Sequence, residues 1–431
     1  MVEHGDVVNF DLPRATALAI IERLGRGIPP RIHTSKYSAG HDYLMADIRD
    51  EFLSVDNLPG KMKFIAGSWG SGKTHVLRLI AEEALQCNWV VATVELSNNE
   101  APFNKIEKVV GSIIRNIADL AIEEDETRPA FPLASFITGE VRRLARERGF
   151  SENDAAFELE QRLMSDSAIE PDVKKALRHF LQTLGKEDSF TNSVLVDRRD
   201  YIMQWFVGET NKTSMRRDFD IHTELDSGTA DRMLSSIIRV IRILGYQGLV
   251  VLLDESDMTF SIMKNAQLGV AFNNLRVLLD SIDTKRSLLV FFAGVPDFWT
   301  DERHGLMLYG ALYGRIGRIP EEEPYIDSTV WNIDALQVSP SMALESASKI
   351  RRLFLIAYNK SSESIISEEQ LGEYALDIME NHPKFSRVSK WRMITTEIVQ
   401  ILNKSKSGRS IGTPEEERAA AEESMRSLGD D

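Results

Sequence analysis

The chain has 431 residues and a formal net charge of −15, with 43% hydrophobic and 27% charged residues. This composition suits a soluble globular protein of two or three domains with a large core. The acidic balance argues against a protein that coats nucleic acid by bulk electrostatics, although it leaves room for a local basic surface. A single cysteine, Cys87, excludes an internal disulfide framework and a cysteine zinc site, so we expect a reducing, cytoplasmic location.

Residues 1–60 are expected to form a helical segment that packs on the core of the next domain. Ala15–Leu24 and His41–Phe52 have the spacing of amphipathic helices, and Gly27–Pro30 separates them. A helix-loop-helix before a nucleotide-binding strand often covers the base, but plain packing explains these helices equally well. The N-terminus lacks the regions of a signal peptide and no apolar run is long enough for a bilayer, so we expect no membrane association.

Residues 63–79 read as a short apolar strand, a glycine-rich turn and the start of a helix. The turn Gly67–Thr74 matches the phosphate-binding pattern G-x-x-x-x-G-K-[ST] in full. Its glycines permit backbone conformations in which N–H groups surround a phosphate, and the helix start adds the positive end of its dipole. Lys73 would bind the β- and γ-phosphates and assist catalysis, and the Thr74 hydroxyl would bind Mg²⁺.

The pattern therefore predicts ATP and Mg²⁺ as cofactors. The alternative is a Gly/Ser turn with an exposed lysine. The expected ATP-binding residues of the turn are Gly67, Ser68, Trp69, Gly70, Ser71, Gly72, Lys73, Thr74 and His75.

The next elements predict a parallel sheet interrupted by a helical insertion. Trp89–Leu96 reads as a buried strand and Asn104–Leu120 as a helix; Glu95 could face the attacking water or a neighbouring subunit, or simply be a solvated strand end. Residues 121–235 are charged and helical, without a clear strand, and we interpret their arginine clusters as solvated helix faces and loops. The predicted helices of the insertion cover 139–149, 154–164, 171–184 and 198–206.

A second motif follows the insertion. Gly248–Leu253 is an apolar strand that runs directly into Asp254 and Glu255. Asp254 would hold Mg²⁺ and Glu255 would polarise the attacking water, whereas a coincidental exposed carboxylate pair is the alternative. Because ligands sit at the carboxyl ends of parallel strands, this motif and the glycine-rich turn should meet at one edge.

Three further regions of the chain bear on catalysis. The turn after the strand Ser287–Ala293 offers no polar residue before Asp297, so a γ-phosphate sensor is not expected there. Arg315 or Arg318, with Arg315 preferred, could reach the nucleotide of a neighbouring subunit as an arginine finger, or form a structural salt bridge. Arg387 could reach the γ-phosphate from the C-terminal helices.

The predicted fold class is α/β: a parallel sheet flanked by helices, with a helical insertion and a C-terminal helical lid. The expected domains are residues 1–60, the core 61–320 with its insertion at about 121–235, the lid 321–405, and a disordered polar tail, 406–431. Helices are predicted at 342–359, 367–380 and 388–402 within the lid.

Four segments carry a resemblance to a known family: GSWGSGKTHVLRLI, VVATVELSNNEAPFNKI, GLVVLLDES and LLVFFAGVPDFW. In this order and spacing they resemble the P-loop ATP-binding proteins of BREX bacteriophage-defence systems, especially the shorter, BrxD-like members. The family is similar to AAA+ ATPases of the origin-recognition and helicase-loader branch. The resemblance covers most of residues 10–400 and implies ATP binding at Lys73, Thr74, Asp254 and Glu255.

The resemblance also implies a homo-oligomeric ATPase that acts on DNA, loading or remodelling a partner helicase or another defence-system protein. Two other functions stay open from the residues. One is a nucleotide-dependent switch or scaffold that hydrolyses ATP slowly. The other is a direct DNA motor, for which strong stimulation by DNA and a steep salt dependence are expected.

Overall fold

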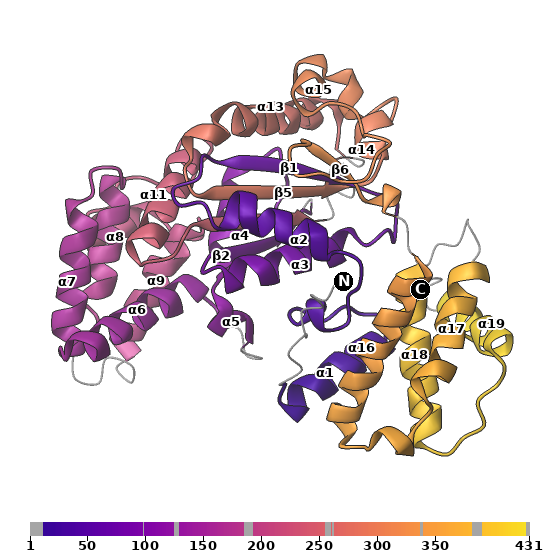
Figure 1. Ribbon diagram of the computed structural model, residues 1–431. Helices are drawn as coiled ribbons and strands as arrows, with labels where there is room; N and C mark the ends of the chain where they lie inside the picture. Colours follow the sequence, from indigo (N-terminus) through magenta and orange to yellow (C-terminus); the bar gives the residue numbers. More distant parts are fainter. Residues whose placement is uncertain are drawn as a thin grey trace.

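A six-stranded sheet forms the centre of the computed structural model, which describes residues 12–97, 99–124, 129–184, 193–254, 260, 263–336, 339–381 and 390–427 (Figure 1). The strand order is β3-β2-β4-β5-β1-β6, and every pairing is parallel except that of the edge strand β3. The strands are β1 Lys61–Ala66, β2 Val90–Glu95, β3 Ile117–Ala118, β4 Leu249–Asp254, β5 Leu288–Gly294 and β6 Val330–Asn332. The mostly parallel sheet confirms the α/β prediction.

The register of the sheet brings several strand ends to one edge. Glu95 pairs with Asp254, and Ala66 pairs with Gly294. The carboxyl ends of β1, β2, β4 and β5 therefore lie together, where parallel sheets bind their ligands.

Both faces of the sheet are covered by helices, because successive side chains of a buried strand point to opposite sides. Phe64 and Phe292 face one core, formed with α4, α11 and α13, whereas Ile65 and Phe291 face the other, formed with α2 and α3. Figure 1 shows α13 and α15 above the sheet and α2 and α3 below it. These helices are α2 Asp42–Ile48, α3 Lys73–Gln86, α4 Ile106–Arg115, α11 Ala230–Ile243, α13 Asn265–Ser281, α14 Asp297–Thr300 and α15 Gly310–Ile316.

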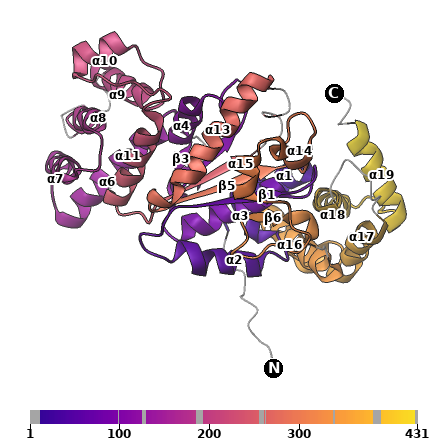
Figure 2. The same cartoon turned by 90° about the horizontal axis from the view of Figure 1, so that it is seen from above.

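The helical insertion forms a lobe beyond the edge strand β3, at the far end of the sheet from the C-terminal helices (Figures 1 and 2). Its core is continuous with that of α4 and α11. Most arginines predicted to be solvated are exposed, and Arg143 and Arg148 pair with Glu147 and Glu158. Arg199 on α9 contradicts the prediction, because it is buried at 7% exposure. The helices are α5 Leu120–Glu124, α6 Pro132–Arg148, α7 Glu152–Ser165, α8 Pro171–Leu181, α9 Ser193–Phe206 and α10 Lys212–Phe219.

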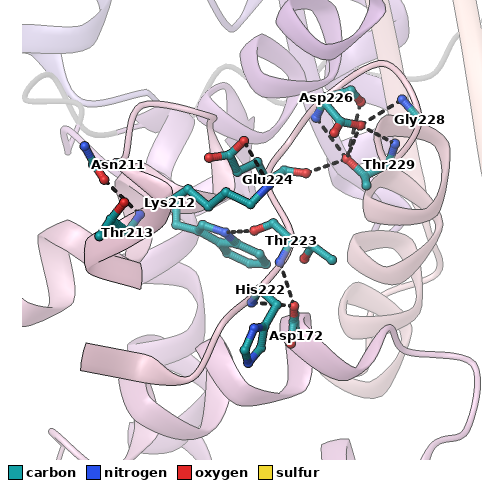
Figure 3. Close-up of polar contacts among 11 residues, drawn as sticks. Asp172, Asn211, Lys212, Thr213, His222, Thr223, Glu224, Asp226, Gly228 and Thr229 are labelled. Atoms are coloured by element: carbon teal, nitrogen blue, oxygen red, sulfur yellow. Dashed lines mark hydrogen bonds and ion pairs between the residues drawn. The ribbon is translucent and has the colours of Figure 1, made fainter. Parts of the chain in front are cut away.

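Polar contacts fix the segment that leads from this lobe back to the sheet (Figure 3). One carboxylate oxygen of Asp172 accepts from the backbone N–H groups of His222 and Thr223, at 2.9 and 2.8 Å. Asp226 then accepts from the backbone N–H groups of Gly228 and Thr229, at 2.8 and 2.9 Å. These bonds satisfy donors of an irregular segment just before α11, which leads into β4.

A separate helical unit combines both ends of the described chain. Helix α1, Arg14–Gly25, packs against α16 and α18, and its Ile20 and Ile21 are buried in the core that these helices share. Figure 1 shows α1 beside α16 at lower right, away from the sheet. The other helices of this unit are α16 Pro340–Tyr358, α17 Glu368–Asn381, α18 Lys390–Lys406 and α19 Pro414–Ser427.

The structure departs from the sequence predictions in four places. Helix α1 packs on the C-terminal helices instead of the sheet domain, because its apolar face completes their core. The tail expected to be disordered contains α19, which packs on α17 and α18. The predicted helix 104–120 ends at Arg115 and gives way to β3, and β6 was not predicted. In the described part of the chain, no helix is long and apolar enough to cross a membrane.

Candidate functional site

The glycine-rich turn, residues 67–72, connects β1 to α3 at the shared edge of the sheet. Gly70 and Gly72 have φ angles of 76° and 102°, a region that L-residues with a Cβ rarely adopt. At Gly67 a Cβ would lie 2.4 Å from the Ser71 hydroxyl and 2.6 Å from a side-chain carbon of Ile333. The turn therefore requires glycine at these positions for conformational and steric reasons.

Lys73, the first residue of α3, folds back over the turn. Its ammonium donates to the carbonyls of Gly67 and Ser68, at 2.9 and 3.0 Å, and lies 5.6 Å from the ring centroid of Trp69. The lysine is buried, whereas Trp69 is 63% exposed. These carbonyl contacts hold a cation in the turn at a place where phosphate oxygens could also be bound.

Thr74 and Asp254 are joined directly. The Thr74 hydroxyl donates to a carboxylate oxygen of Asp254 at 2.7 Å, although the two residues are 180 positions apart. Asp254 is buried at the carboxyl end of β4, and α3 packs against that strand. One hydroxyl and one carboxylate therefore meet beside Lys73, as expected for oxygen ligands of Mg²⁺.

Two oxygens do not complete a metal site by themselves. Among the described residues, no group of three or more His, Cys, Asp and Glu side chains could hold a metal ion. A magnesium ion at Thr74 and Asp254 would fit this donor set only if phosphate oxygens and water supplied the remaining ligands, which is the usual coordination of Mg²⁺.

A cavity of about 370 Å³ opens between the glycine-rich turn and the helical unit. This volume lies within the usual range for small-molecule sites. The end beside the turn is polar, with Lys73, Thr74 and Asp254. The remaining lining is largely apolar or aromatic and comes from α1, the 27–41 segment, α16 and α18: Leu24, Ile28, Pro29, Tyr37, Ala39, His41, Ser346, Trp391 and Thr395.

A hydrogen-bonded group links α3 to the segment before the sheet. The Ser38 hydroxyl lies 2.8 Å from His75 Nε2 and 3.3 Å from His41 Nδ1. Burial, with the nearby His41 and Arg78 as smaller causes, lowers the pKa of His75 to about 3, so its ring is neutral at pH 7. A neutral ring can either donate to or accept from the serine hydroxyl.

The same segment is held by the helical unit. The backbone carbonyl of Tyr37 accepts from the Ser346 hydroxyl at 2.9 Å, and that of Ser38 accepts from the Lys349 ammonium at 2.6 Å. The expectation that the early helix-loop-helix lines a nucleotide site is thus consistent with the cavity. Sequence reasoning missed the α18 residues Trp391 and Thr395, because nothing local in the sequence places α18 beside the turn.

The remaining predicted site residues are dispersed or lie outside the described residues. Arg315, on α15, is exposed and bonds to both carboxylate oxygens of Asp280, at 2.5 and 3.2 Å. Arg318 is exposed just after α15. Glu255 and Arg387 lie outside the described residues.

A comparison with known families agrees with this arrangement of turn, carboxylate and cavity. The family described as BREX system ATP-binding proteins BrxC/D matches residues 12–416. The match spans nearly the whole chain, and the chain belongs to this family, which confirms the predicted resemblance and supports an ATP-binding role in phage defence. No curated protein and no solved structure matches the chain at a significant level.

Proposed function

We propose that this chain binds ATP with Mg²⁺ in the 370 Å³ cavity and hydrolyses it. The observation that carries the proposal is the 2.7 Å hydrogen bond between Thr74 and Asp254 beside the Lys73 ammonium. It brings a hydroxyl, a carboxylate and a cation from two distant motifs to the mouth of one cavity. That combination suits a magnesium–triphosphate and has no evident structural need at a strand end.

Each part of the nucleotide has a matching part of the cavity. The N–H groups of Gly67, Ser68 and Ser71 are bonded within the protein. The other N–H groups of the glycine-rich turn and the start of α3 would hold the phosphates, and Lys73 would exchange its carbonyl contacts for phosphate oxygens. The Thr74 hydroxyl oxygen and the Asp254 carboxylate would hold Mg²⁺, with the hydroxyl proton turned away from Asp254. The base would lie in the aromatic part of the cavity, near Tyr37 and Trp391.

Hydrolysis is assigned to Glu255, which follows Asp254 directly in the sequence. A carboxylate at this position can orient a water molecule for in-line attack on the γ-phosphate. The water would lose a proton to the carboxylate as its oxygen bonds to the γ-phosphorus, and the bond from the γ-phosphorus to the β–γ bridging oxygen would break, so that ADP leaves with that electron pair and inorganic phosphate forms.

We further propose that the protein is an AAA+-like ATPase that assembles with other copies and acts on DNA with a partner. An additional strand, β5, separates β4 with Asp254 from β1 with the glycine-rich turn, and this order supports the class. Exposed Arg318 supports assembly, since an arginine finger must reach outward to another subunit's nucleotide. Family membership supports a defence-system protein as partner.

A slow nucleotide-dependent switch is the second candidate, and one observation favours it. Ala293, Gly294 and Val295 are buried and apolar at the turn after β5, so they offer the γ-phosphate no polar side chain. Asp297 follows but is exposed. Turnover would then be slow without a partner.

The test compares two neighbouring carboxylates. Asp254→Asn should remove the Mg²⁺-dependent gain in ATP affinity, because it removes a charged metal ligand, whereas Glu255→Gln should keep that gain and stop hydrolysis. Calorimetric titration with and without Mg²⁺, followed by a phosphate-release assay, measures both effects. Unchanged Mg²⁺ dependence in Asp254→Asn, or wild-type turnover in Glu255→Gln, would contradict the assignment. Measurable binding with negligible wild-type turnover would favour the switch.

A further inference from the structure

An acidic side chain from a different strand contacts the glycine-rich turn. Asp334 lies in the short 3₁₀ turn Ile333–Ala335 that follows β6. One of its carboxylate oxygens accepts from the Ser68 backbone N–H at 2.8 Å and from the Ser68 hydroxyl at 2.7 Å. A carboxylate is therefore fixed at the second residue of a turn to which we assign the binding of an anion.

Asp334 is held in place by its own neighbours. Its backbone N–H donates to the Asn332 side-chain oxygen at 3.1 Å, and the Asn332 side-chain amide donates to the Pro320 carbonyl at 2.8 Å. Asn332 also pairs in register with Ala66, the last residue of β1. The position of the carboxylate is thus set by the strand that begins the glycine-rich turn.

The carboxylate is close enough to act on charges in the turn. The carbonyl of the same Ser68 accepts from the Lys73 ammonium at 3.0 Å, so a single residue separates the two charged groups. Bond dimensions then place them within about 10 Å of one another. That distance is comparable with the Debye length at physiological salt, so the charges are only partly screened.

We propose that Asp334 is a positioning residue that sets how strongly the site prefers ATP over ADP. The proposal rests on the proposed ATP site. The carboxylate holds Ser68 in the position in which its carbonyl accepts from Lys73. The negative charge of the carboxylate repels the additional negative charge of a γ-phosphate. It thereby reduces the preference for the triphosphate, and a protein without this charge binds ATP relatively more tightly.

Two substitutions separate the charge of Asp334 from its hydrogen bonds. Asp334→Asn keeps an oxygen acceptor for Ser68 but removes the charge, whereas Asp334→Ala removes both. Glu322→Gln is the matched control, since Glu322 is an exposed carboxylate in the connection before β6 and the change in charge is identical. The dissociation constants of ADP and of a non-hydrolysable ATP analogue are measured by calorimetry with Mg²⁺ on the full chain.

The expected result for Asp334→Asn is a rise in the ATP-to-ADP affinity ratio of about two- to fivefold, from Coulomb energies at partly screened distances. Asp334→Ala should shift the ratio in the same direction and also weaken both nucleotides, and Glu322→Gln should leave the ratio unchanged. A purely structural Asp334 would give an unchanged ratio in Asp334→Asn and an equal loss for both nucleotides in Asp334→Ala; either result overturns the inference. A wild-type protein that binds neither nucleotide would instead refute the proposed function itself.

Discussion

Two single residues, Thr74 and Asp254, show how a local motif and the sheet register combine. The position of Thr74 depends on the turn before α3. The position of Asp254 depends on the register of β4 with β2, in which Asp254 pairs with Glu95. The 2.7 Å bond between them needs both conditions at once. A one-residue shift of β4 would turn Asp254 to the other face of the sheet and break it.

Another residue, Glu397 of α18, stands out because it is buried without a hydrogen-bond partner. The side chain is 1% exposed, and neither carboxylate oxygen has a partner among the described residues. Burial is the main cause that raises the pKa of Glu397 to about 8, with Asp377 and Glu417 as further causes; Arg418 and Lys404 act in the opposite direction. The glutamate is therefore protonated in the folded protein at neutral pH.

We predict that Glu397→Gln stabilises the protein increasingly as pH rises from 5 to 8. The folded-state pKa lies above the unfolded value of about 4.5. Folding therefore takes up a proton in this window, and wild-type stability falls as pH rises through it. Glutamine does not ionise, so the variant avoids this loss, which the two pKa values put at about 4 kcal/mol at pH 8.

Urea denaturation at pH 5 and pH 8 measures the difference in the free energy of unfolding between variant and wild type. Glu373→Gln, an exposed position on α17, is the control and should show no pH-dependent difference. An equal effect of Glu397→Gln at both pH values would contradict the raised pKa.

The sequence predicted Lys73, Thr74 and Asp254 as site residues because each belongs to a short motif: the glycine-rich turn, or the apolar strand that ends in two acidic residues. It did not indicate Trp391 or Asp334. These residues reach the cavity and the turn through tertiary packing of α18 and through pairing of β6 with β1, and neither contact leaves a periodic or compositional signal.

Helix α1 is the element whose role differs most from the prediction. Its spacing correctly predicts an amphipathic helix, but spacing cannot indicate which surface the apolar face meets. In the structure that face packs on α16 and α18, so the described chain begins in the helical unit, crosses to the sheet and returns.

We predict that Ile21→Ala loosens the helical unit and leaves the sheet intact. Ile21 is 1% exposed between α1 and its partners, and such truncations cost about 2–5 kcal/mol. Hydrogen exchange should show lost protection in α16 and α18, with β4 and β5 unchanged. Glu22→Ala, on the exposed side of α1, serves as control. Loss of protection first in the strands would contradict this placement of α1.

Short elements were predicted less well than long ones. The three residues of β6 carry too little pattern to be recognised, and β3 has only two residues. In the structure β6 pairs with the last three residues of β1, and β3 pairs with Val91 and Ala92 of β2. The long buried strands β4 and β5 were predicted almost to the residue, since continuous apolar runs between turn signals are typical of parallel sheets.

At the scale of the whole molecule, the cavity lies between the sheet and the helical unit, which contributes α1, α16 and α18 to its walls. A ligand in the cavity would therefore contact both parts. The two candidate arginines, Arg315 on α15 and Arg318 just after it, do not line this cavity, and we propose that one of them serves the nucleotide of a second copy.

We predict that ATPase activity per molecule rises with protein concentration and that Arg318→Ala abolishes this rise. A finger residue stabilises the transition state across an interface, so its loss should lower the assembled rate at least about tenfold. Arg315→Ala tests the other candidate. Arg315 would have to break its salt bridge with Asp280 before it could reach another subunit's nucleotide. Arg286→Ala is the control, because Arg286 is an exposed arginine just before β5.

Turnover that does not depend on concentration in the wild type, or a full rise in both arginine variants, would contradict a finger supplied by a second copy. The measurement is phosphate release across a dilution series, with light scattering on the same samples to record assembly.

The most direct test of the proposed ATP site is whether Lys73→Ala binds ATP. Lys73 donates to the carbonyls of the glycine-rich turn and is assigned the contact with the β- and γ-phosphates. Lys61→Ala, an exposed lysine at the far end of β1, is the matched control. In an equilibrium titration with Mg²⁺, we expect the wild type and Lys61→Ala to bind ATP and Lys73→Ala not to bind it. Binding of ATP by Lys73→Ala with wild-type affinity would contradict the proposed ATP site.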